Sequence, residues 1–221
     1  MAGKYAIDFY FDVISPYSFI GFESLLRYRT KWSMDVKLKP FCLGHVMKMA
    51  NNKPPALACP AKAPYLGRDV TRLAKYYDIP LKFPKNFIEV ITTKSTLNAD
   101  RLLLAVMIEQ PEKTEAVARA LFRRFWVEEN GIFDTEDFKQ VLESCKMSNV
   151  DKLISMIGSE EVKQKLRQHN EDAVNDGCFG APWTVLHHPD GRSDAFFGSD
   201  RLHIIGSIMG QTFEGPLSSK I

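Results

Sequence analysis

The chain has few residues of the types that build metal centres and disulfide frameworks. Its four cysteines, Cys42, Cys59, Cys145 and Cys178, lie far apart along 221 residues and match neither a zinc-binding pattern nor a small-domain disulfide pattern. The five histidines show no ligand spacing either. We therefore expect a reduced intracellular protein with no metal cofactor, in which each cysteine is a small buried apolar residue.

Long apolar runs and a strong net charge are also missing. The longest uncharged stretch of the central region, Leu102 to Ile108, is far shorter than the roughly 20 apolar residues that cross a bilayer. An alternating segment starts at Tyr5 and leaves no room for a signal peptide before it. The 29 basic and 27 acidic residues leave a formal charge of +2, so neither nucleic acid nor an anionic membrane is indicated as a partner.

What the chain does contain is a strand, a turn and a helix at its start. Residues 4–13 alternate between apolar and polar side chains, with two aspartates on the polar face, which predicts a strand. Ser15 and Pro16 have the form of an N-cap followed by a proline at the first helical position, so a helix is expected to about Trp32. A second alternating segment, 34–41, completes a β-α-β unit in which parallel pairing is favoured.

A proline-rich segment, 51–64, is expected to be irregular and leads into a helical block. The periodicity predicts helices over residues 65–78, 95–110, 112–129, 135–145, 149–157 and 160–176, with caps at Ser95, Asp134, Ser148 and Ser159, and strands over 182–186 and 195–197. Gly177 ends the helical block, and the two strands form an antiparallel hairpin. A last helix is expected to be capped by Ser199 or Asp200.

This order of elements predicts an α/β fold in which a thioredoxin-like domain is interrupted by an inserted all-helical domain. We place the thioredoxin-like domain at residues 1–64 plus 177–221 and the helical insertion at 65–176. Ser15-Pro16-Tyr17-Ser18 lies at the turn where thioredoxin-like redox proteins carry Cys-x-x-Cys. Serine at both positions excludes dithiol exchange there and leaves a helix N-terminus suited to a bound thiolate.

Four motifs in this order resemble the kappa-class glutathione transferases over nearly the whole chain. They are Phe11 to Ser18, Asn52-Lys53-Pro54-Pro55, Phe179-Gly180-Ala181-Pro182 and Phe197 to Arg201. That class is related to the DsbA-like disulfide oxidoreductases and to bacterial 2-hydroxychromene-2-carboxylate isomerases. The resemblance implies a DsbA-like fold and an enzyme that conjugates the thiolate of glutathione, its substrate, to small electrophiles in detoxification.

The resemblance also gives roles to individual residues. Ser15 is implied as the catalytic residue that holds the sulfur as a thiolate, and the glutathione-binding residues are Ser15, Pro16, Tyr17, Asn52, Lys62, Ala181, Pro182, Ser199 and Asp200. Within this set, the main chain of Ala181, before a cis proline, pairs with the cysteinyl part. Many members carry a larger aliphatic residue at this position. Alanine leaves the main-chain pairing intact and is expected to change the size of the space beside the sulfur. Asn52 and Lys62 meet the glycyl end, and Ser199 and Asp200 meet the γ-glutamyl end.

Several alternatives stay open at this point. Ser15, Ser199 and Asp200 can be plain helix caps, and Lys62 a solvated lysine. The activity can be that of a glutathione-dependent isomerase of the 2-hydroxychromene-2-carboxylate type, and a non-redox thioredoxin-like binding module is the non-enzymatic alternative. The resemblance implies a homodimer. Ser219-Lys220-Ile221 is one apolar change from the peroxisomal Ser-Lys-Leu signal, which predicts a peroxisomal protein, with the mitochondrial matrix as the alternative.

Overall fold

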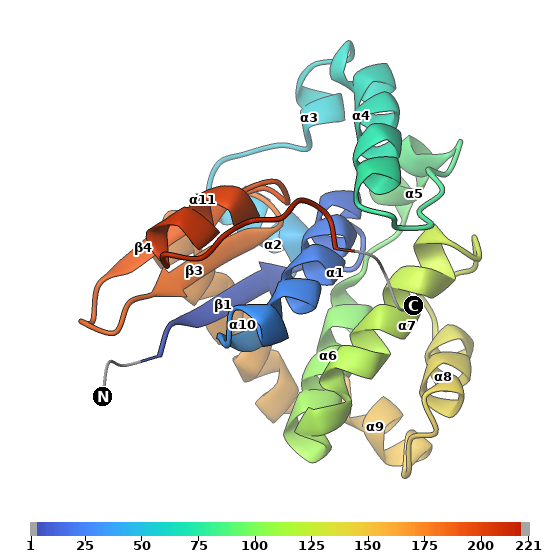
Figure 1. The fold of residues 1–221 in the computed structure, drawn as a ribbon. Coiled ribbons are helices and arrows are strands. Elements are labelled where there is room, and N and C mark those ends of the chain that lie inside the picture. The colour runs from blue at the N-terminus through green and yellow to red at the C-terminus, as the bar shows by residue number, and fades with distance from the viewer. Residues whose placement is uncertain (1–3, 218–221) are drawn as a thin grey trace.

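A mixed four-stranded sheet forms the centre of the computed structural model, which describes residues 4–217 (Figure 1). The strand order is β2-β1-β3-β4, with β1 (Ala6–Phe11) parallel to β2 (Asp35–Pro40) and antiparallel to β3 (Trp183–His187). Antiparallel pairing joins β3 to the edge strand β4 (Ser193–Phe197). Both the predicted β-α-β unit and the predicted hairpin are therefore confirmed.

Helices surround this sheet and fill the long interval between β2 and β3. The helices of the described residues are α1 (Pro16–Lys31), α2 (Leu43–Met49), α3 (Pro55–Ala58), α4 (Lys62–Tyr76), α5 (Phe87–Thr93), α6 (Leu97–Glu109), the 3-10 helix η1 (Pro111–Lys113), α7 (Thr114–Trp126), α8 (Thr135–Ser144), α9 (Val150–Met156), α10 (Glu160–Asn175) and α11 (Leu202–Ile208). Figure 1 shows α4 to α9 on one side of the sheet. This is the predicted thioredoxin-like fold with a helical insertion. The exact domain boundaries stay a prediction. Helix α4 begins at Lys62, three residues before the predicted start of the helical insertion at residue 65.

Local capping signals account for several helix ends. The Ser15 side chain accepts the N–H of Ser18 at 3.1 Å, and Pro16 is the first residue of α1. Asp134 forms a complete capping box at α8, and Ser159 caps α10 through its side chain. These three caps confirm the predictions made from the sequence.

Other predicted caps were wrong by one or two residues. The residue before α6 is Thr96, although the hydroxyl of Ser95 does accept the N–H of Leu97, the first residue of α6, at 3.3 Å. The residue before α9 is Asn149 rather than Ser148, and the residue before α11 is Arg201 rather than Ser199 or Asp200. The Asp200 carboxylate pairs with the Arg201 guanidinium at 3.0 Å, and within residues 4–217 it accepts no bond from a helix N–H. Neither Ser199 nor Asp200 therefore caps α11.

Three short helices, α2, α3 and α5, are absent from the sequence prediction. Each has seven residues or fewer, and none has a side-chain cap. Such short segments give too few turns for a helical period to show, and the four residues of α3 lie inside the proline-rich segment expected to be irregular. They matter because α2 and α5 carry residues of the candidate site.

The hydrophobic core runs from the sheet into the inserted helices. The rings of Phe122 in α7 and Phe19 in α1 stack with centroids 5.1 Å apart, and Phe122 also lies 5.8 Å from Phe11 of β1. The opposite face of β1, predicted to be polar, buries Tyr10 against Phe41. Both faces of the sheet are covered, which fixes the end of β1 and the turn that follows it.

No helix among residues 4–217 is long and apolar enough to cross a membrane. The tripeptide Ser219-Lys220-Ile221 lies outside the described residues, so the peroxisomal signal stays a prediction.

Candidate active site

The turn between β1 and α1 places Ser15 at the N-terminus of a 16-residue helix. Its hydroxyl oxygen accepts the Ser18 N–H, and its main-chain N–H donates to the carbonyl of Asp12 at 3.0 Å. The hydroxyl proton is donated to the carbonyl of Ala181 at 3.4 Å, which is long for a bond between two oxygen atoms. Because that bond is weak, little is lost when the proton turns toward a ligand.

A cavity of about 650 Å³ opens beside this turn. Its volume falls within the range of roughly 300–1,000 Å³ that small-molecule sites occupy. Six of the nine predicted glutathione residues line it: Ser15, Pro16, Tyr17, Asn52, Lys62 and Ala181. They come from the start of α1, the loop after α2, the first residue of α4 and the segment before β3. The fold therefore brings together residues that are far apart in the sequence.

The other three predicted residues, Pro182, Ser199 and Asp200, do not line this cavity. The Ala181–Pro182 bond is cis, as the resemblance implied, and the carbonyl of Pro182 accepts the N–H of Gly198 at 3.1 Å. This hydrogen bond holds Gly198, the residue before Ser199, next to the residue that follows Ala181 of the cavity lining. The Ser199 side chain is buried, and its hydroxyl has no hydrogen-bond partner among the described residues. An unpartnered buried hydroxyl is an unsatisfied group that a ligand can pair with.

Tyr17 has its hydroxyl committed elsewhere. It donates to the Asp69 carboxylate of α4 at 2.7 Å. Burial, followed by this hydrogen bond and by nearby negative charges that include Asp200, raises the pKa of Tyr17 well above its ordinary value. Tyr17 therefore stays a neutral phenol and contributes its ring and main chain to the cavity.

Asn52 connects two sides of the cavity. Its side-chain amide donates to the carbonyl of Phe179 at 2.7 Å, and its side-chain oxygen accepts the N–H of Lys53 at 2.8 Å. The loop after α2 is thereby fixed against the segment that leads to Ala181. Asn52 thus positions the walls of the cavity, besides any contact with a ligand.

Three lysines, Lys53, Lys62 and Lys94, also line the cavity. None of them makes an ion pair with an acidic side chain in the part of the chain that the structure describes. Asp12 is the one acidic residue of the lining, and it is 1% exposed. The open part of the cavity is therefore positively charged and suited to an anionic ligand. Lys94 was not predicted, because a single lysine between two helices carries no sequence signal.

A second part of the cavity lining is apolar. Leu66 of α4 and Phe87 and Ile91 of α5 lie along it, and Leu43 and Met47 of α2 continue it. None of these five residues was predicted as part of the site. Four of them lie in the seven-residue helices α2 and α5 and Leu66 lies in α4, and as apolar helical residues they resemble ordinary core residues.

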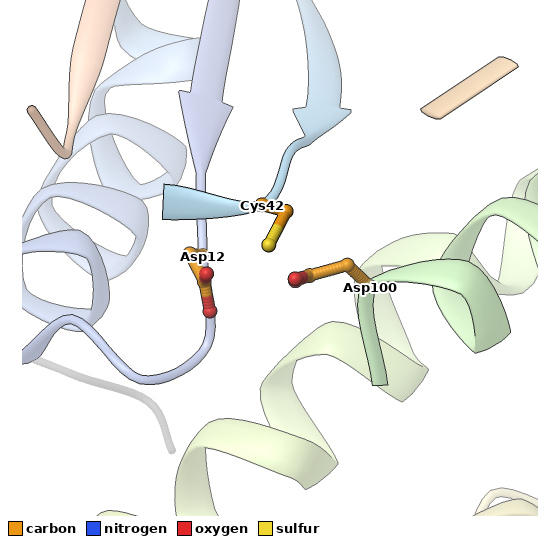
Figure 2. Close-up of side chains that lie close together, drawn as sticks. All are labelled: Asp12, Cys42 and Asp100. Atoms are coloured by element: carbon orange, nitrogen blue, oxygen red, sulfur yellow. The ribbon is translucent and has the colours of Figure 1, made fainter. Parts of the chain in front are cut away.

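A cluster of buried acidic groups lies beneath the Ser15 turn and was also missed. Figure 2 shows Asp12, Cys42 and Asp100 pointing toward one another from three different elements. Their carboxylate oxygens and the sulfur all lie within 4.8 Å of one another, and all three side chains are buried. Side chains of these types can also ligate a metal ion. The sequence contained part of this signal, since Asp12 directly follows β1 and precedes the Ser15 turn.

All four cysteines are free. Cys42 and Cys178 are buried as predicted, whereas Cys59 and Cys145 are only partly buried. Burial raises the pKa of Cys178 to about 12, and its thiol donates to the carbonyl of Gly180 at 3.2 Å. Burial likewise raises the pKa of Cys42. Both buried thiols are therefore protonated at neutral pH, which removes them as nucleophiles.

Comparisons with known proteins agree with this geometry. The family model described as a DSBA-like thioredoxin domain matches residues 6–209. The chain is 35% identical to glutathione S-transferase kappa 2 of Caenorhabditis elegans, over 100% of this chain and 98% of that protein. It is 37% identical to glutathione S-transferase kappa 1 of Rattus norvegicus, over 96% of this chain and 93% of that protein.

More distant similarity extends to an isomerase. The chain is 24% identical to the 2-hydroxychromene-2-carboxylate isomerase of Pseudomonas putida, over 93% of this chain and 94% of that protein. Among solved structures, a 2-hydroxychromene-2-carboxylate isomerase superposes with a TM-score of 0.77 at 22% identity, over 93% of this chain and 94% of the other. At that identity the likeness supports the fold alone.

Proposed function

Because the chain belongs to the kappa-class glutathione S-transferases of the DsbA-like thioredoxin family, we propose that it binds glutathione beside Ser15 and transfers its sulfur to an electrophilic carbon. The observation that carries this proposal is the Ser15 hydroxyl. It lies at the N-terminus of α1, it lines a cavity whose lysines make no ion pair among residues 4–217, and its own hydrogen bond to the protein is weak.

Ser15 would act by stabilising the thiolate form of glutathione. A free cysteine thiol has a pKa of about 8.5, so lowering it by about 2 units requires about 2.7 kcal/mol of preference for the thiolate. A hydrogen bond to a charged group contributes about 1.5–3 kcal/mol, and a helix N-terminus about 0.3–1 kcal/mol. One bond from the Ser15 hydroxyl and the end of α1 together supply the required amount.

The rest of glutathione would follow the predicted residues. The main chain of Ala181 would pair with the cysteinyl part, since it lies next to the Ser15 hydroxyl. Lys62, which has no acidic partner among the described residues, would take the glycyl carboxylate beside Asn52. Ser199 and Asp200 would meet the γ-glutamyl end, and the unpartnered Ser199 hydroxyl supports this orientation.

The second substrate would occupy the apolar wall formed by Leu66, Phe87 and Ile91. An apolar electrophile such as an activated aryl halide fits this lining. The thiol proton leaves to solvent, the sulfur attacks the carbon, and the halide departs with the electron pair of the bond that breaks. Holding the two reactants together and supplying a thiolate account for the acceleration. Removal of reactive electrophiles in this way is a detoxification step.

Calorimetric titration with free glutathione, followed by product analysis, tests this function. We expect binding, the ultraviolet absorbance of a thiolate at neutral pH, and one glutathione consumed for each conjugate formed. Glutathione recovered unchanged beside an isomerised product would support the isomerase instead, which the 24% identical relatives favour as the second candidate. No binding of glutathione would support a non-redox binding module.

We also propose that the protein is a homodimer with a peroxisomal address, the mitochondrial matrix being the alternative. The support is the resemblance to the kappa class and the sequence Ser219-Lys220-Ile221. Light scattering should give about twice the chain mass of 25.1 kDa, and the mass of one chain would contradict the dimer. A tagged protein without the tripeptide should leave peroxisomes, and unchanged targeting would exclude this signal.

A further inference from the structure

Two buried carboxyl groups lie together beneath the glutathione site without a basic partner. Asp12 is 1% exposed and Asp100 is 0% exposed. Their oxygen atoms and the Cys42 sulfur lie within 4.8 Å of one another (Figure 2). Among the described residues, neither carboxyl group makes an ion pair with a lysine, arginine or histidine. Two adjacent negative charges would be costly in this environment.

The two groups differ sharply in their hydrogen bonds. Asp12 accepts the N–H of Ile14 at 3.0 Å, the N–H of Leu43 at 2.8 Å and the hydroxyl of Thr96 at 2.9 Å. Among the residues that the structure describes, no donor group bonds to either oxygen of Asp100, and the side chain that can pair with a protonated Asp100 is Asp12. Donors favour the charged form of a carboxyl group. Asp12 is therefore the better place for a negative charge and Asp100 the better place for a proton.

The surroundings support the same assignment. Burial, and after it the charge of Asp12 and a hydrogen bond with it, raises the pKa of Asp100 well above its ordinary value. Burial also raises the pKa of Asp12, but hydrogen bonds from Ile14, Leu43 and Thr96 act in the opposite direction there. Cys42 is a neutral thiol, and α10 brings the uncharged amide of Asn170, which accepts the Cys42 N–H at 2.9 Å. Burial lowers the pKa of His169, also on α10, to about 4, so it is neutral at pH 7. Asp100 lies in the first turn of α6, and the favourable effect of that helix end on a carboxylate is small against burial.

We propose that Asp12 and Asp100 hold one proton between them, with Asp100 as the acid and Asp12 as the carboxylate, and that this pair positions Ser15 for thiolate binding. The two are positioning residues, since the proposed contact with the glutathione sulfur is made by Ser15. The second half of this inference rests on the proposed function, whereas the first half does not depend on it.

The position of Asp12 explains how the pair acts on the site. Its side-chain carboxylate accepts the N–H of Ile14, and its main-chain carbonyl accepts the N–H of Ser15 at 3.0 Å. The same carboxylate holds Leu43, the first residue of α2, and Thr96, the residue before α6. Ile14, Leu43 and Thr96 all line the cavity. One anion therefore fixes the Ser15 turn relative to both neighbouring helices, and a neutral Asp100 keeps that anion free of a competing charge.

Infrared spectroscopy of the full-length protein tests the proton directly. At neutral pH we expect the carbonyl band of a buried protonated carboxylic acid in the wild type and in Asp12→Asn, and its loss in Asp100→Asn. Absence of the band in the wild type would overturn the proposal. A band that is lost in Asp12→Asn and kept in Asp100→Asn would overturn the assignment to Asp100.

The pH dependence of stability gives an independent readout. Because the folded-state pKa of Asp100 is raised, the folded protein keeps a proton that the unfolded chain loses above about pH 4. Asp100 therefore stabilises the fold least at high pH, and wild-type stability should fall from about pH 4 upward relative to Asp100→Asn. An identical pH profile for the two proteins would contradict the shared proton, even if neither protein has transferase activity.

Amide hydrogen exchange tests the positioning role without any ligand. Ile14 and Leu43 bond to different oxygens of Asp12, and asparagine keeps only one of them, so in Asp12→Asn at least one of these two amides should exchange faster, while Asp100→Asn should leave both protected. Conjugation should fall between about 10-fold and 100-fold in Asp12→Asn, with glutathione affinity less affected, because small misplacements cost that much. Unchanged exchange in Asp12→Asn, or equal damage in Asp100→Asn, would overturn the role. If Asp12→Asn does not fold, the infrared spectrum and the pH profile of Asp100→Asn still test whether Asp100 carries the proton.

Discussion

The two walls of the cavity differ in origin and chemistry. The wall at the end of the sheet presents the Ser15 hydroxyl and the main chain at Ala181, whereas the wall from the inserted helices presents Leu66, Phe87 and Ile91. The first wall is held by hydrogen bonds within and beside one turn. The second is held by packing, as in the contact between the rings of Phe87 and Trp126, whose centroids are 5.4 Å apart.

This difference assigns separate tasks to the two walls. A polar wall of fixed donors can distinguish a thiolate from a thiol, because hydrogen bonds to charged groups are directional and strong. An apolar wall of aliphatic and aromatic side chains can accept many electrophiles, because dispersion and burial are not directional. Changes in the polar wall should therefore affect turnover or glutathione affinity, and changes in the apolar wall should affect the second substrate.

The largest effect is expected for Ser15→Ala. Removing the donor to the thiolate should lower kcat by about 100-fold to 1,000-fold, similar to the loss of one donor from an oxyanion site. The helix also loses its cap, which costs about 1 kcal/mol of the free energy of unfolding. Steady-state kinetics and calorimetry should show glutathione still bound. Ser15→Thr keeps the hydroxyl and should retain much of the activity, and equal loss in both variants would place the defect in the turn.

A smaller effect is expected for Lys62→Met, which removes the predicted partner of the glycyl carboxylate. We expect KM for glutathione to rise about 10-fold with kcat little changed, since one charge-assisted bond is lost equally in the ground and transition states. Lys53→Met is the matched control, because Lys53 lines the same cavity and also makes no ion pair among the described residues. A larger rise in Lys53→Met than in Lys62→Met would exchange their roles.

Truncation of the apolar wall should act on the other substrate alone. Ile91→Ala removes three carbon atoms from the cavity lining, so KM for an apolar electrophile should rise by about 5-fold while glutathione affinity stays constant. Ile88→Ala on the same helix is the control, since Ile88 is 38% exposed and does not line the cavity. A change in glutathione affinity in Ile91→Ala would mean that the two walls do not work separately.

The same contrast explains what the sequence could predict. Ser15 and Pro16 carry their structure locally, because an N-cap and a first-turn proline are recognisable within two residues, and the structure has the predicted helix at that point. Asp134 is similar. The Ser15 turn and the thioredoxin-like order of elements could therefore be predicted from local patterns, whereas the place of Ala181 in the polar wall was implied only by the resemblance to the kappa class.

The apolar wall and the acid pair could not be predicted, because they depend on packing between distant segments. Asp100 sits in a run of helix-forming residues and resembles an exposed residue of the first turn, yet it is fully buried against Asp12, 88 positions earlier. Phe87 and Ile91 lie in a helix of seven residues that gave no period. Only the fold shows that these side chains meet.

The smallest effect is expected for Ser18→Ala, which distinguishes the two serines of the turn. The Ser18 hydroxyl is fully buried and has no hydrogen-bond partner among the described residues, whereas its main-chain N–H is the one that Ser15 accepts. Alanine keeps that N–H and removes an unsatisfied group, so the free energy of unfolding should rise or stay within about 1 kcal/mol of the wild type, as measured by denaturant titration. Turnover should change less than about twofold, because the hydroxyl does not line the cavity. A loss comparable to that of Ser15→Ala would show that the polar wall uses both hydroxyl groups, and that the contrast between one catalytic serine and its structural neighbour is wrong.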